Sequence, residues 1–448
     1  MTPINSETSV ANSAFMHAPL RKVLMLAYYF PPMGLSGVQR TAKFVKYLPE
    51  FGWKPIVLTI NPTAYFAYDD SLLAELSHPA IEIVRTDTKD ITKAASAATG
   101  KRQFKMPSEQ TRRFLSALSQ LVFIPDNKIG WKKFAIEKAS EIIEREKDID
   151  VIYSTAPPFS SHLIALELRA KYHLPAVLDF RDPWVENAAH LYCTPFHRRK
   201  HEALEEYVLT HADRIITANR ALKELFLRKY LGQLQHKDIS IIWHGYDADD
   251  FRQVQPDSRT RRKLRFVYSG RFFLSSPAPF FRGLKAAIVQ EPALRESVEL
   301  CFVGLFEKEH MSLAEKLGLK DMIEVHGYRP HLEAIAELLR GDVLWATLNP
   351  VKGTEVITHG KLFEYIGARK TLFGIVPEGA AHQLILEANG VVAHPKKTQD
   401  IAQKILELYA LWKRNMLPTP TEDFVQRFER RQLTAQLAKE FGQLIRIE

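Results

Sequence analysis

The chain has 448 residues, of which 46% are hydrophobic and 25% are charged, and its formal net charge at pH 7 is +9. The length excludes a single hydrophobic core and predicts two domains, and the composition is that of a globular protein. The positive charge favours anionic partners such as nucleotide sugars, phospholipid surfaces or nucleic acid, although a solvated surface with a few additional lysines and arginines explains it equally well.

Residues 1–20 are small and polar, and they lack the basic segment and apolar core of a signal peptide. We expect them to be disordered. No stretch approaches the roughly 18 consecutive apolar residues of a membrane-spanning helix. The two cysteines, Cys193 and Cys301, form no C-x-x-C pair, so neither a zinc site nor a redox pair is indicated. These features predict a protein of the reducing cytoplasm.

Residues 21–45 predict a strand, a glycine loop and the start of a helix. The apolar run 23–29 has the length of a buried parallel strand, and a Pro-Pro pair ends it because proline cannot donate to the ladder. Gly34 and Gly37 follow before apolar residues recur at helical spacing. Backbone N–H groups and the helix dipole meet in such a loop, so it can hold an anion. An ordinary strand-to-helix turn is the alternative.

Residues 86–124 differ in composition from the segments around them. They begin as a polar stretch rich in lysine and arginine, which we interpret as a long mobile insertion, and end in an apolar, helix-like segment from 114 to 124. A basic arm beside an apolar helix could lie on an anionic membrane. We favour a solvated loop that leads into a packed helix.

Residues 150–158 repeat the opening design, since a short apolar strand is again stopped by prolines and followed by a helix. Ser160 or Ser161 is the expected N-cap of that helix. Another strand begins at Ala176 and runs into the segment 179–184. Because strands alternate with helices throughout this half, we expect a parallel sheet with helices on both faces.

The pattern predicts two Rossmann-like α/β domains in tandem, joined by a polar linker at 248–263. The first domain is expected at 21–247, the second at 264–420, and a final helix at 421–448. Ligands of such sheets lie beyond the carboxyl ends of the strands, so the cleft between the domains is the expected site.

Cations and a carboxylate gather at two predicted element ends of the second domain. Gly270 and Arg271 follow its first strand, while Gly360 and Lys361 open a helix that contains Glu364 one turn later. Two cations beside backbone donors are what a diphosphate requires. The carboxylate could accept hydroxyl groups of a ribose or sugar, and the alternative is an ordinary salt bridge or helix-dipole partner.

Seven blocks in order resemble the large retaining family 4 of GT-B glycosyltransferases, and they cover roughly residues 21 to 445. The blocks are the Pro-Pro-Gly-Gly loop, 150–158 with 179–184, 212–215, 244–247, 268–271, 326–327 and 360–365. The resemblance implies a GT-B fold with a nucleotide-sugar donor in the C-terminal domain and an acceptor on the N-terminal domain. It also implies no metal, and a last helix that crosses back onto the first domain.

The resemblance assigns roles to individual residues. Gly34 and Gly37 match the glycine loop near the donor phosphate. Arg271 matches the arginine that contacts the diphosphate, and Glu364 matches the second glutamate of an E-x7-E motif, which holds the ribose. We add Gly270, Gly360 and Lys361 to the donor-binding set on the reasoning from element ends.

The sequence departs from the family pattern at three places. Ser276 stands where a lysine is usual, five residues after the arginine, and Lys361 could supply that charge. The first glutamate of E-x7-E would fall at Val356, with Glu355 one residue out of register. Thr155 replaces the histidine that contacts the transferred sugar.

Acidic and basic residues remain close to that strand end. Asp179, Arg181 and Asp182 could take over the role of the missing histidine. We therefore expect the catalytic residues to be Asp182, Arg181 and Thr155.

The interpretation is a metal-independent glycosyltransferase without a cofactor. It would move a hexose or related sugar from a UDP- or GDP-sugar to a hydroxyl of a glycan or lipid-linked glycan, with retention, in cell-surface polysaccharide or glycoconjugate biosynthesis. We expect it in the cytoplasm, with contact to the inner membrane face through 86–124 as a further option. The alternatives are a catalytically weak scaffold that binds a nucleotide sugar or a partner transferase, and an epimerase or phosphorylase on the same fold. Nucleic acid is not an expected partner, because no basic motif is interleaved with aromatic residues.

Overall fold

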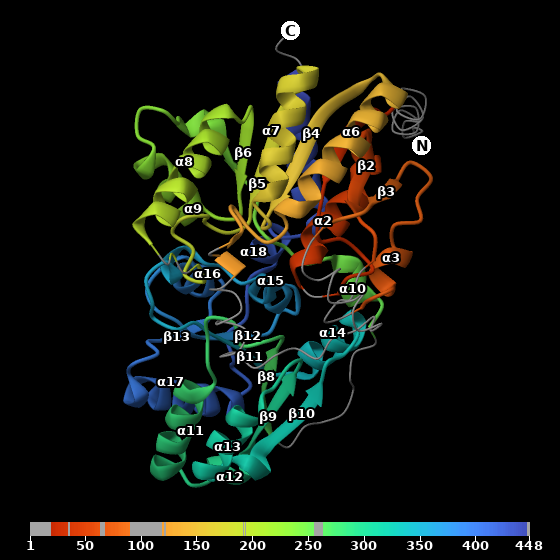
Figure 1. Ribbon diagram of the computed structural model, residues 1–448. Helices are drawn as coiled ribbons and strands as arrows, with labels where there is room; N and C mark the ends of the chain where they lie inside the picture. The colour runs from red at the N-terminus through yellow and green to blue at the C-terminus, as the bar shows by residue number, and fades with distance from the viewer. Residues whose placement is uncertain are drawn as a thin grey trace, which may run out of the picture.

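The computed structural model shows two α/β domains stacked one above the other (Figure 1). It describes residues 19–34, 36–62, 68–89, 119–120, 122–190, 192, 194–254 and 263–445. Most of the expected disordered segment 1–20 and of the expected membrane contact 86–124 lies outside these residues. Among the described helices, none combines the length and the hydropathy that crossing a lipid bilayer requires.

The first sheet has seven parallel strands in the order β3-β2-β1-β4-β5-β6-β7. The strands are β1 (Arg21–Leu26), β2 (Trp53–Ile60), β3 (Glu82–Thr86), β4 (Ile149–Ala156), β5 (Ala176–Phe180), β6 (Arg214–Thr217) and β7 (Ile239–Ile241). The strand order reverses at β1, which pairs with both β2 and β4. At such a switch point the loops on either side diverge and leave room for a ligand beyond the carboxyl ends of the strands.

Helices cover both faces of this sheet. They are α2 (Ser36–Tyr47), α3 (Ser71–Ala74), α6 (Lys132–Glu146), α7 (Ser160–Tyr172), α8 (Pro195–His211) and α9 (Arg220–Lys229), with short turns η1 (Leu48–Phe51), η2 (Ile129–Trp131) and η3 (His236–Asp238). Alternate residues of a strand point to opposite faces. Accordingly, Leu24 and Leu26 pack in one core with α6 and α7, while Val23 and Met25 pack in another with α2.

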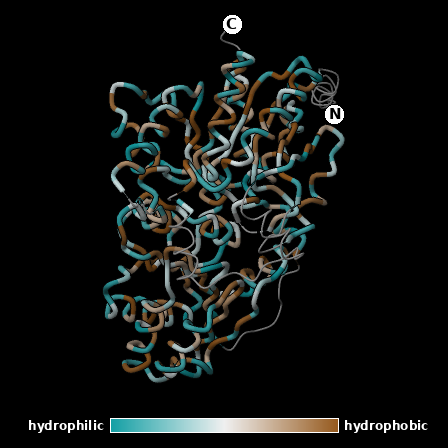
Figure 2. Tube along the Cα trace, in the orientation of Figure 1, coloured by the Kyte–Doolittle hydropathy of each residue, from teal (hydrophilic) through white to brown (hydrophobic). Residues whose placement is uncertain are grey.

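The second sheet has six parallel strands in the order β10-β9-β8-β11-β12-β13. They are β8 (Leu264–Ser269), β9 (Val298–Val303), β10 (Ile323–Gly327), β11 (Val343–Thr347), β12 (Thr371–Ile375) and β13 (Val391–Ala393). In Figure 2, brown hydrophobic segments run along strands of both domains. Both sheets therefore have the buried, near-continuous apolar strands that parallel sheets require.

The helices that belong to the second half of the chain begin inside the expected linker. They are α10 (Ala248–Arg252), α11 (Ala278–Gln290), α12 (Leu294–Ser297), α13 (Lys308–Lys316), α14 (His331–Arg340), α15 (Gly360–Gly367), α16 (Ala380–Glu387), α17 (Thr398–Lys413) and α18 (Glu422–Gln426), with turns η4 (Lys320–Met322) and η5 (Thr354–Val356). Of the expected linker 248–263, the first five residues form α10, whose Asp250 is buried, and 255–262 lie outside the described residues.

The last helix, α19 (Arg430–Ile445), returns to the first domain and packs on α2 and η1. Its Phe441 lies in the core on that face, with ring centroids 5.1 Å from Trp53 and 6.0 Å from Tyr153. The predicted fold class, including the crossing helix, is confirmed.

Candidate active site

Of the seven residues expected to bind the donor, the structure brings together the five of the second domain, because the end of β8 lies beside the start of α15. Gly34 and Gly37 lie at the start of α2 in the first domain. Lys361 Nζ lies 3.5 Å from the carbonyl oxygen of Arg271 and 3.8 Å from the ring centroid of Tyr268. Gly360 opens α15, and a Cβ atom there would meet no described heavy atom within 4 Å. Glu364 follows one turn later on the same helix. This corner therefore presents an ammonium, a guanidinium, an open helix N-terminus and a carboxylate.

Two glycines allow backbone segments to approach one another closely at this corner. Gly270 has φ +92°, and a Cβ atom on it would lie 3.4 Å from Lys361 Nζ. Gly304, at the end of β9, has φ +120°, and its Cβ atom would lie 2.5 Å from the carbonyl oxygen of Gly270. Side chains are excluded at Gly304 on both counts, so the strand ends approach closely beside the cations.

Burial shifts the pKa values of Lys361 and Glu364 on α15. It lowers the pKa of Lys361 to about 7, with Arg271 acting in the same direction and Glu364 opposing it. Burial also raises the pKa of Glu364, and Arg430, Lys361 and the protonated form of His331 counteract that rise. No described side chain donates a hydrogen bond to the Glu364 carboxylate, so its oxygens are available to a ligand.

Arg181 fixes the glycine loop of the first domain. Its Nη1 donates to the carbonyl oxygen of Gly37, its Nη2 to that of Pro157, and its Nε to that of Ala156 at 3.1 Å. Gly34 lies buried in the same loop, just before α2. The guanidinium thus joins the N-terminus of α2 to the carboxyl end of β4.

Asp179 is the centre of a buried network below that loop. Its carboxylate accepts from Nε and Nη2 of Arg40, both at 2.8 Å, from the Tyr153 hydroxyl at 2.7 Å and from the Thr155 hydroxyl at 3.2 Å. Burial alone would raise the pKa of Asp179, but the Arg40 guanidinium outweighs it and holds the pKa below the usual range. The carboxylate therefore stays ionised as an internal anchor.

Asp182 is the one of the three expected catalytic residues whose polar atoms are uncommitted. It is half-buried and has no hydrogen bond to any described residue. Burial raises the pKa of its carboxyl group, while Arg181 lowers it. Thr155 and Arg181, by contrast, use their polar atoms inside the first domain.

The positions that depart from the family pattern have structural partners of their own. Val356 is buried, and its carbonyl oxygen accepts from the Asn219 side chain at 2.9 Å across the domain boundary. The exposed Glu355 accepts from the backbone N–H of Gly353 at 2.7 Å and so stabilises its own turn. Ser276 accepts from the N–H of Ala278 at 3.2 Å at the start of α11.

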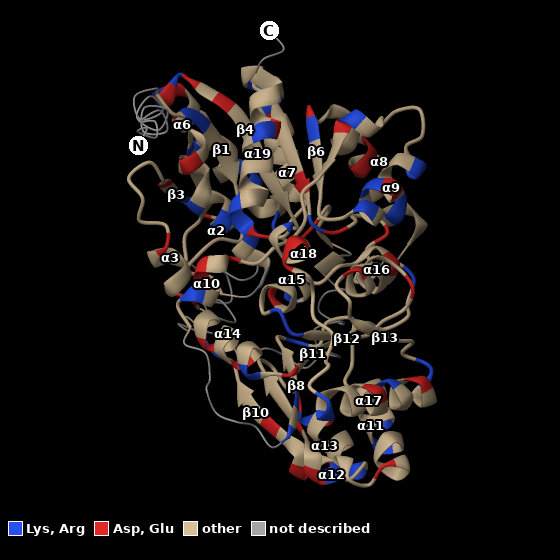
Figure 3. Ribbon diagram, turned by 180° about the vertical axis from the view of Figure 1, so that it is seen from behind, with Lys and Arg blue, Asp and Glu red and all other residues tan. Residues whose placement is uncertain are grey.

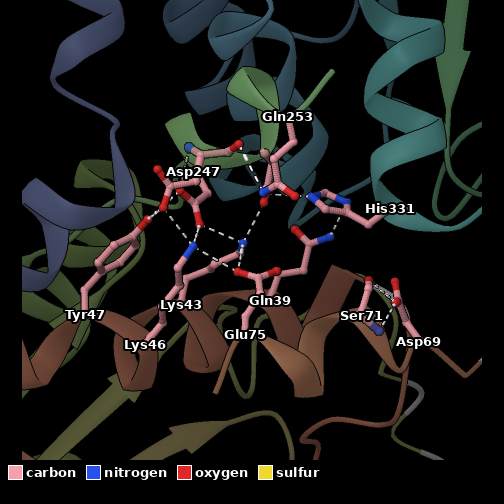
Figure 4. Close-up of polar contacts among 12 residues, drawn as sticks. Gln39, Lys43, Lys46, Tyr47, Asp69, Ser71, Glu75, Asp247, Gln253 and His331 are labelled. Carbon is pink, nitrogen blue, oxygen red and sulfur yellow. Dashed lines mark hydrogen bonds and ion pairs between the residues drawn. The ribbon is translucent and has the colours of Figure 1, made fainter. Parts of the chain in front are cut away.

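A network of charges, which sequence reasoning missed, joins α2 to the segment around α10 (Figure 4). Lys43 Nζ lies 2.7 Å from Asp247, 2.8 Å from Asp250 and 2.6 Å from Glu75. These three carboxylates are close enough to share a cation, and the lysine ammonium supplies that charge. In Figure 3 the basic turns of α2 lie beside the acidic turn of α10.

His331 connects this network to the second domain. Its Nε2 lies 2.9 Å from Oδ2 of Asp250, and Nε2 of Gln39 lies 3.0 Å from its Nδ1. In the neutral ring, Nε2–H donates to Asp250 and Nδ1 accepts from Gln39. These residues line a small cavity together with Glu364 and Arg430. The donor corner and the domain junction are therefore contiguous.

A second set of metal-ligating side chains lies under α14. Cys301, His326 and Glu337 are close enough to share an ion, but Arg265 Nη2 lies 3.1 Å from Glu337. Burial raises the pKa of the Cys301 thiol to about 12, so this sulfur is a protonated thiol. Arg265 and Arg340, which both contact Glu337, supply the positive charge of this cluster.

Comparison with known proteins gives one family match and many similar structures. Residues 98–250 match the model described as Glycosyltransferase Family 4. No curated protein sequence matches the chain.

Three solved structures illustrate the likeness. Sucrose-phosphate synthase from Thermosynechococcus elongatus has 13% identity and a TM-score of 0.67, over 96% of this chain and 100% of the other. HepE from Anabaena, in complex with UDP and glucose, has 15% identity and a TM-score of 0.61, over 94% and 100%. WaaG, a glycosyltransferase involved in lipopolysaccharide biosynthesis, has 14% identity and a TM-score of 0.59, over 95% and 100%. The likeness over nearly the whole chain shows that this protein has the GT-B fold, as its sequence predicted.

Proposed function

We propose that the protein is a retaining, metal-independent glycosyltransferase of the family 4 type. It transfers a hexose or related sugar from a UDP- or GDP-sugar to a hydroxyl of a glycan or lipid-linked glycan. The observation that carries this proposal is the donor corner, where Arg271 and Lys361 lie side by side and Glu364 offers an uncommitted carboxylate. The match of residues 98–250 to the family model supports it.

The donor corner has the chemistry that a nucleoside diphosphate needs. As the glycosidic bond to the donor breaks, negative charge builds up on the leaving diphosphate, and Arg271 and Lys361 would neutralise it. The open N-terminus of α15 at Gly360 adds backbone donors and a favourable dipole. Glu364 would accept the ribose hydroxyls. Two cationic side chains would therefore neutralise the negative charge on the leaving diphosphate.

Across the cleft, the first domain would hold the acceptor and the transferred sugar. Asp182 is the carboxylate that we assign to the reacting sugar, because its oxygens are uncommitted. Arg181 and Thr155 act as positioning residues, since one fixes the Gly37 loop and the other binds Asp179. Only one carboxylate is needed near the sugar if the two-carboxylate arrangement of retaining hydrolases is not used.

The neighbours support UDP-sugars and lipid-linked acceptors within this proposal. HepE was solved with UDP-glucose, and WaaG acts in lipopolysaccharide biosynthesis. An acceptor carried on lipid would place the protein at the inner face of a membrane, with residues 86–124 as the contacting segment.

Thermal unfolding with UDP, GDP, ADP, TDP and CMP, without added metal, tests the proposal. A nucleotide at about a hundred times its dissociation constant adds roughly 2.7 kcal/mol to the free energy of unfolding. We expect UDP or GDP to stabilise the protein, and Arg271→Ala to abolish the shift. Arg295→Ala, in an exposed ion pair with Asp321 of the same domain, is the matched control and should keep it. Absence of any shift would contradict the proposal, and binding without transfer to any acceptor would favour the scaffold alternative.

A further inference from the structure

Arg430 is a buried arginine whose guanidinium has no hydrogen-bond or ion-pair partner among the described residues. It is the first residue of α19 and is only 4% exposed. Its backbone is held firmly, since its N–H donates to the carbonyl oxygen of Tyr246 at 2.9 Å and its carbonyl oxygen accepts from Thr434 at 2.8 Å. The side chain differs, because Nη1 is buried without a hydrogen bond.

Such a group is costly, so it calls for a physical reason. An unpaired buried charge or an unsatisfied buried donor each destabilise a fold, and buried arginines are normally paired. Arg40, another buried arginine nearby, binds Asp179 through two nitrogens. No carboxylate of the described residues lies within ion-pair distance of Arg430.

The cavity between the domains provides the reason. Arg430 and Glu364 both line it, one from the helix that crosses back and the other from the donor domain. Glu364 also lacks a hydrogen bond from any described side chain. A cation and an anion, each without a direct partner, therefore face the same small space from two domains.

We propose that Arg430 is a positioning residue of the donor site, which holds the Glu364 carboxylate ionised and directed toward the ribose of the nucleotide. The inference deepens the proposed function and rests on it. It gives the crossing helix a part in donor binding, although that helix packs on the other domain.

The charges around Glu364 determine in which direction the loss of Arg430 would move its pKa. The charged or titratable groups that face the cavity, or act on Glu364 or Arg430 across it, are Arg40 and Lys43 on α2, Tyr246 and Asp247 before α10, Asp250 on α10, His331 on α14, Lys361 on α15 and Arg430 itself. Burial lowers the pKa of Arg430 to about 10, with Arg40 acting in the same direction, so it still carries its charge at neutral pH. Burial raises the pKa of Glu364, and Arg430 opposes that rise. Without Arg430 the carboxyl group takes up a proton at higher pH.

Calorimetric titration with UDP from about pH 5 to about pH 8 tests the inference, using the full chain and variants at position 430. Arg430→Met removes the charge, and Arg430→Gln is a second neutral variant that keeps a hydrogen-bond donor. If the pKa of Glu364 rises by about one unit, affinity in either variant falls about tenfold at the acidic end, and its midpoint moves to higher pH. Arg430→Lys should retain most of the wild-type profile. Arg431→Met is the matched control, because Arg431 is the next residue and is exposed in an ion pair with Glu50.

The same series in a Glu364→Gln background separates positioning from general damage. There, loss of Arg430 should change UDP affinity little and should no longer move the pH profile. An equal loss in both backgrounds, or a change in thermal stability without a shift of the pH profile, would overturn the inference alone. Absence of nucleotide binding by the wild-type protein would instead overturn the proposed function, and the inference with it.

Discussion

Lys361 is expected to make donor binding sensitive to alkaline pH. Burial lowers its pKa to about 7, and only the protonated form attracts a diphosphate. Affinity for UDP should therefore be highest below that pKa and fall as the pH rises and the ammonium loses its proton. Lys361→Arg should bind with no such decline, because a guanidinium stays charged. Calorimetry across this range measures the effect, and a Lys361→Met variant that keeps the wild-type decline would contradict the assignment.

Asp182 should affect turnover rather than donor affinity. We assign its uncommitted carboxylate to the reacting sugar, where loss of a charge should slow transfer by about a hundredfold or more. Asp182→Asn should therefore lower kcat and leave the dissociation constant of UDP within about twofold, a change of less than about half a kcal/mol. Initial rates with a competent acceptor give both quantities. Asp148→Asn serves as control, because this exposed carboxylate directly precedes β4, at the opposite end of the strand from the site. Equal rates for the two variants would show that Asp182 has no part in the mechanism.

At the scale of elements, the contact between α2 and α10 should contribute strongly to stability. Lys43 and its partners Asp247 and Asp250 are each at most 3% exposed. Lys43→Met removes the cation that the two buried carboxylates share and leaves Asp247 with Lys46 and Asp250 with His331 only. The loss should cost about 3 kcal/mol of unfolding free energy in a urea titration. Lys46→Met, at a more exposed lysine on the same helix, should cost much less. Similar losses for both would show that burial does not set the strength of this contact.

The start of α7 shows an interaction between distant segments that local sequence does not reveal. Ser160 or Ser161 was the expected N-cap, and that prediction is wrong, because Asp126 caps the helix instead. Its Oδ2 accepts from the N–H of Ser160 at 3.0 Å. Asp126→Ala should cost about 1 kcal/mol in the same unfolding assay, whereas Ser161→Ala should cost little. A larger loss for Ser161→Ala than for Asp126→Ala would instead support a cap by the local serine.

At the scale of the whole molecule, α19 should hold the first domain together. Phe441 is fully buried against Trp53 and Tyr153, so Phe441→Ala should lower the free energy of unfolding by about 3–5 kcal/mol. Met416→Ala, at an exposed side chain that follows α17 in the second domain, should have no measurable effect. Hydrogen exchange should locate the added opening in the first domain, and faster exchange in the second domain alone would contradict this picture.

The fold was predictable because its signals are local. Most strands are short apolar runs, and most strand ends are marked by proline or glycine within a few residues, with β3 and β6 as exceptions. The expected donor residues were singled out for the same reason, since Gly270 with Arg271 and Gly360 with Lys361 each lie at one predicted element end, and their role in binding a donor stays a prediction.

Arg40, His331 and Arg430 could not be found in that way. Their significance depends on groups that are distant in sequence, such as Asp250 for His331 at a separation of 81 and Asp179 for Arg40 at a separation of 139. Nothing in the neighbouring sequence distinguishes these side chains from ordinary surface cations. The composition of residues 86–124 says little about how an acceptor would be recognised.

The return of α19 also has a consequence for synthesis on the ribosome. Domains generally fold as units, the N-terminal one first. Here the apolar face formed by Trp53 and Tyr153 is covered by Leu433, Leu437 and Phe441, which are made only after the entire second domain. The apolar face of the first domain therefore stays exposed until the ribosome has synthesised every other element of the chain. A chaperone that recognises exposed apolar surface would find its longest-lived target there.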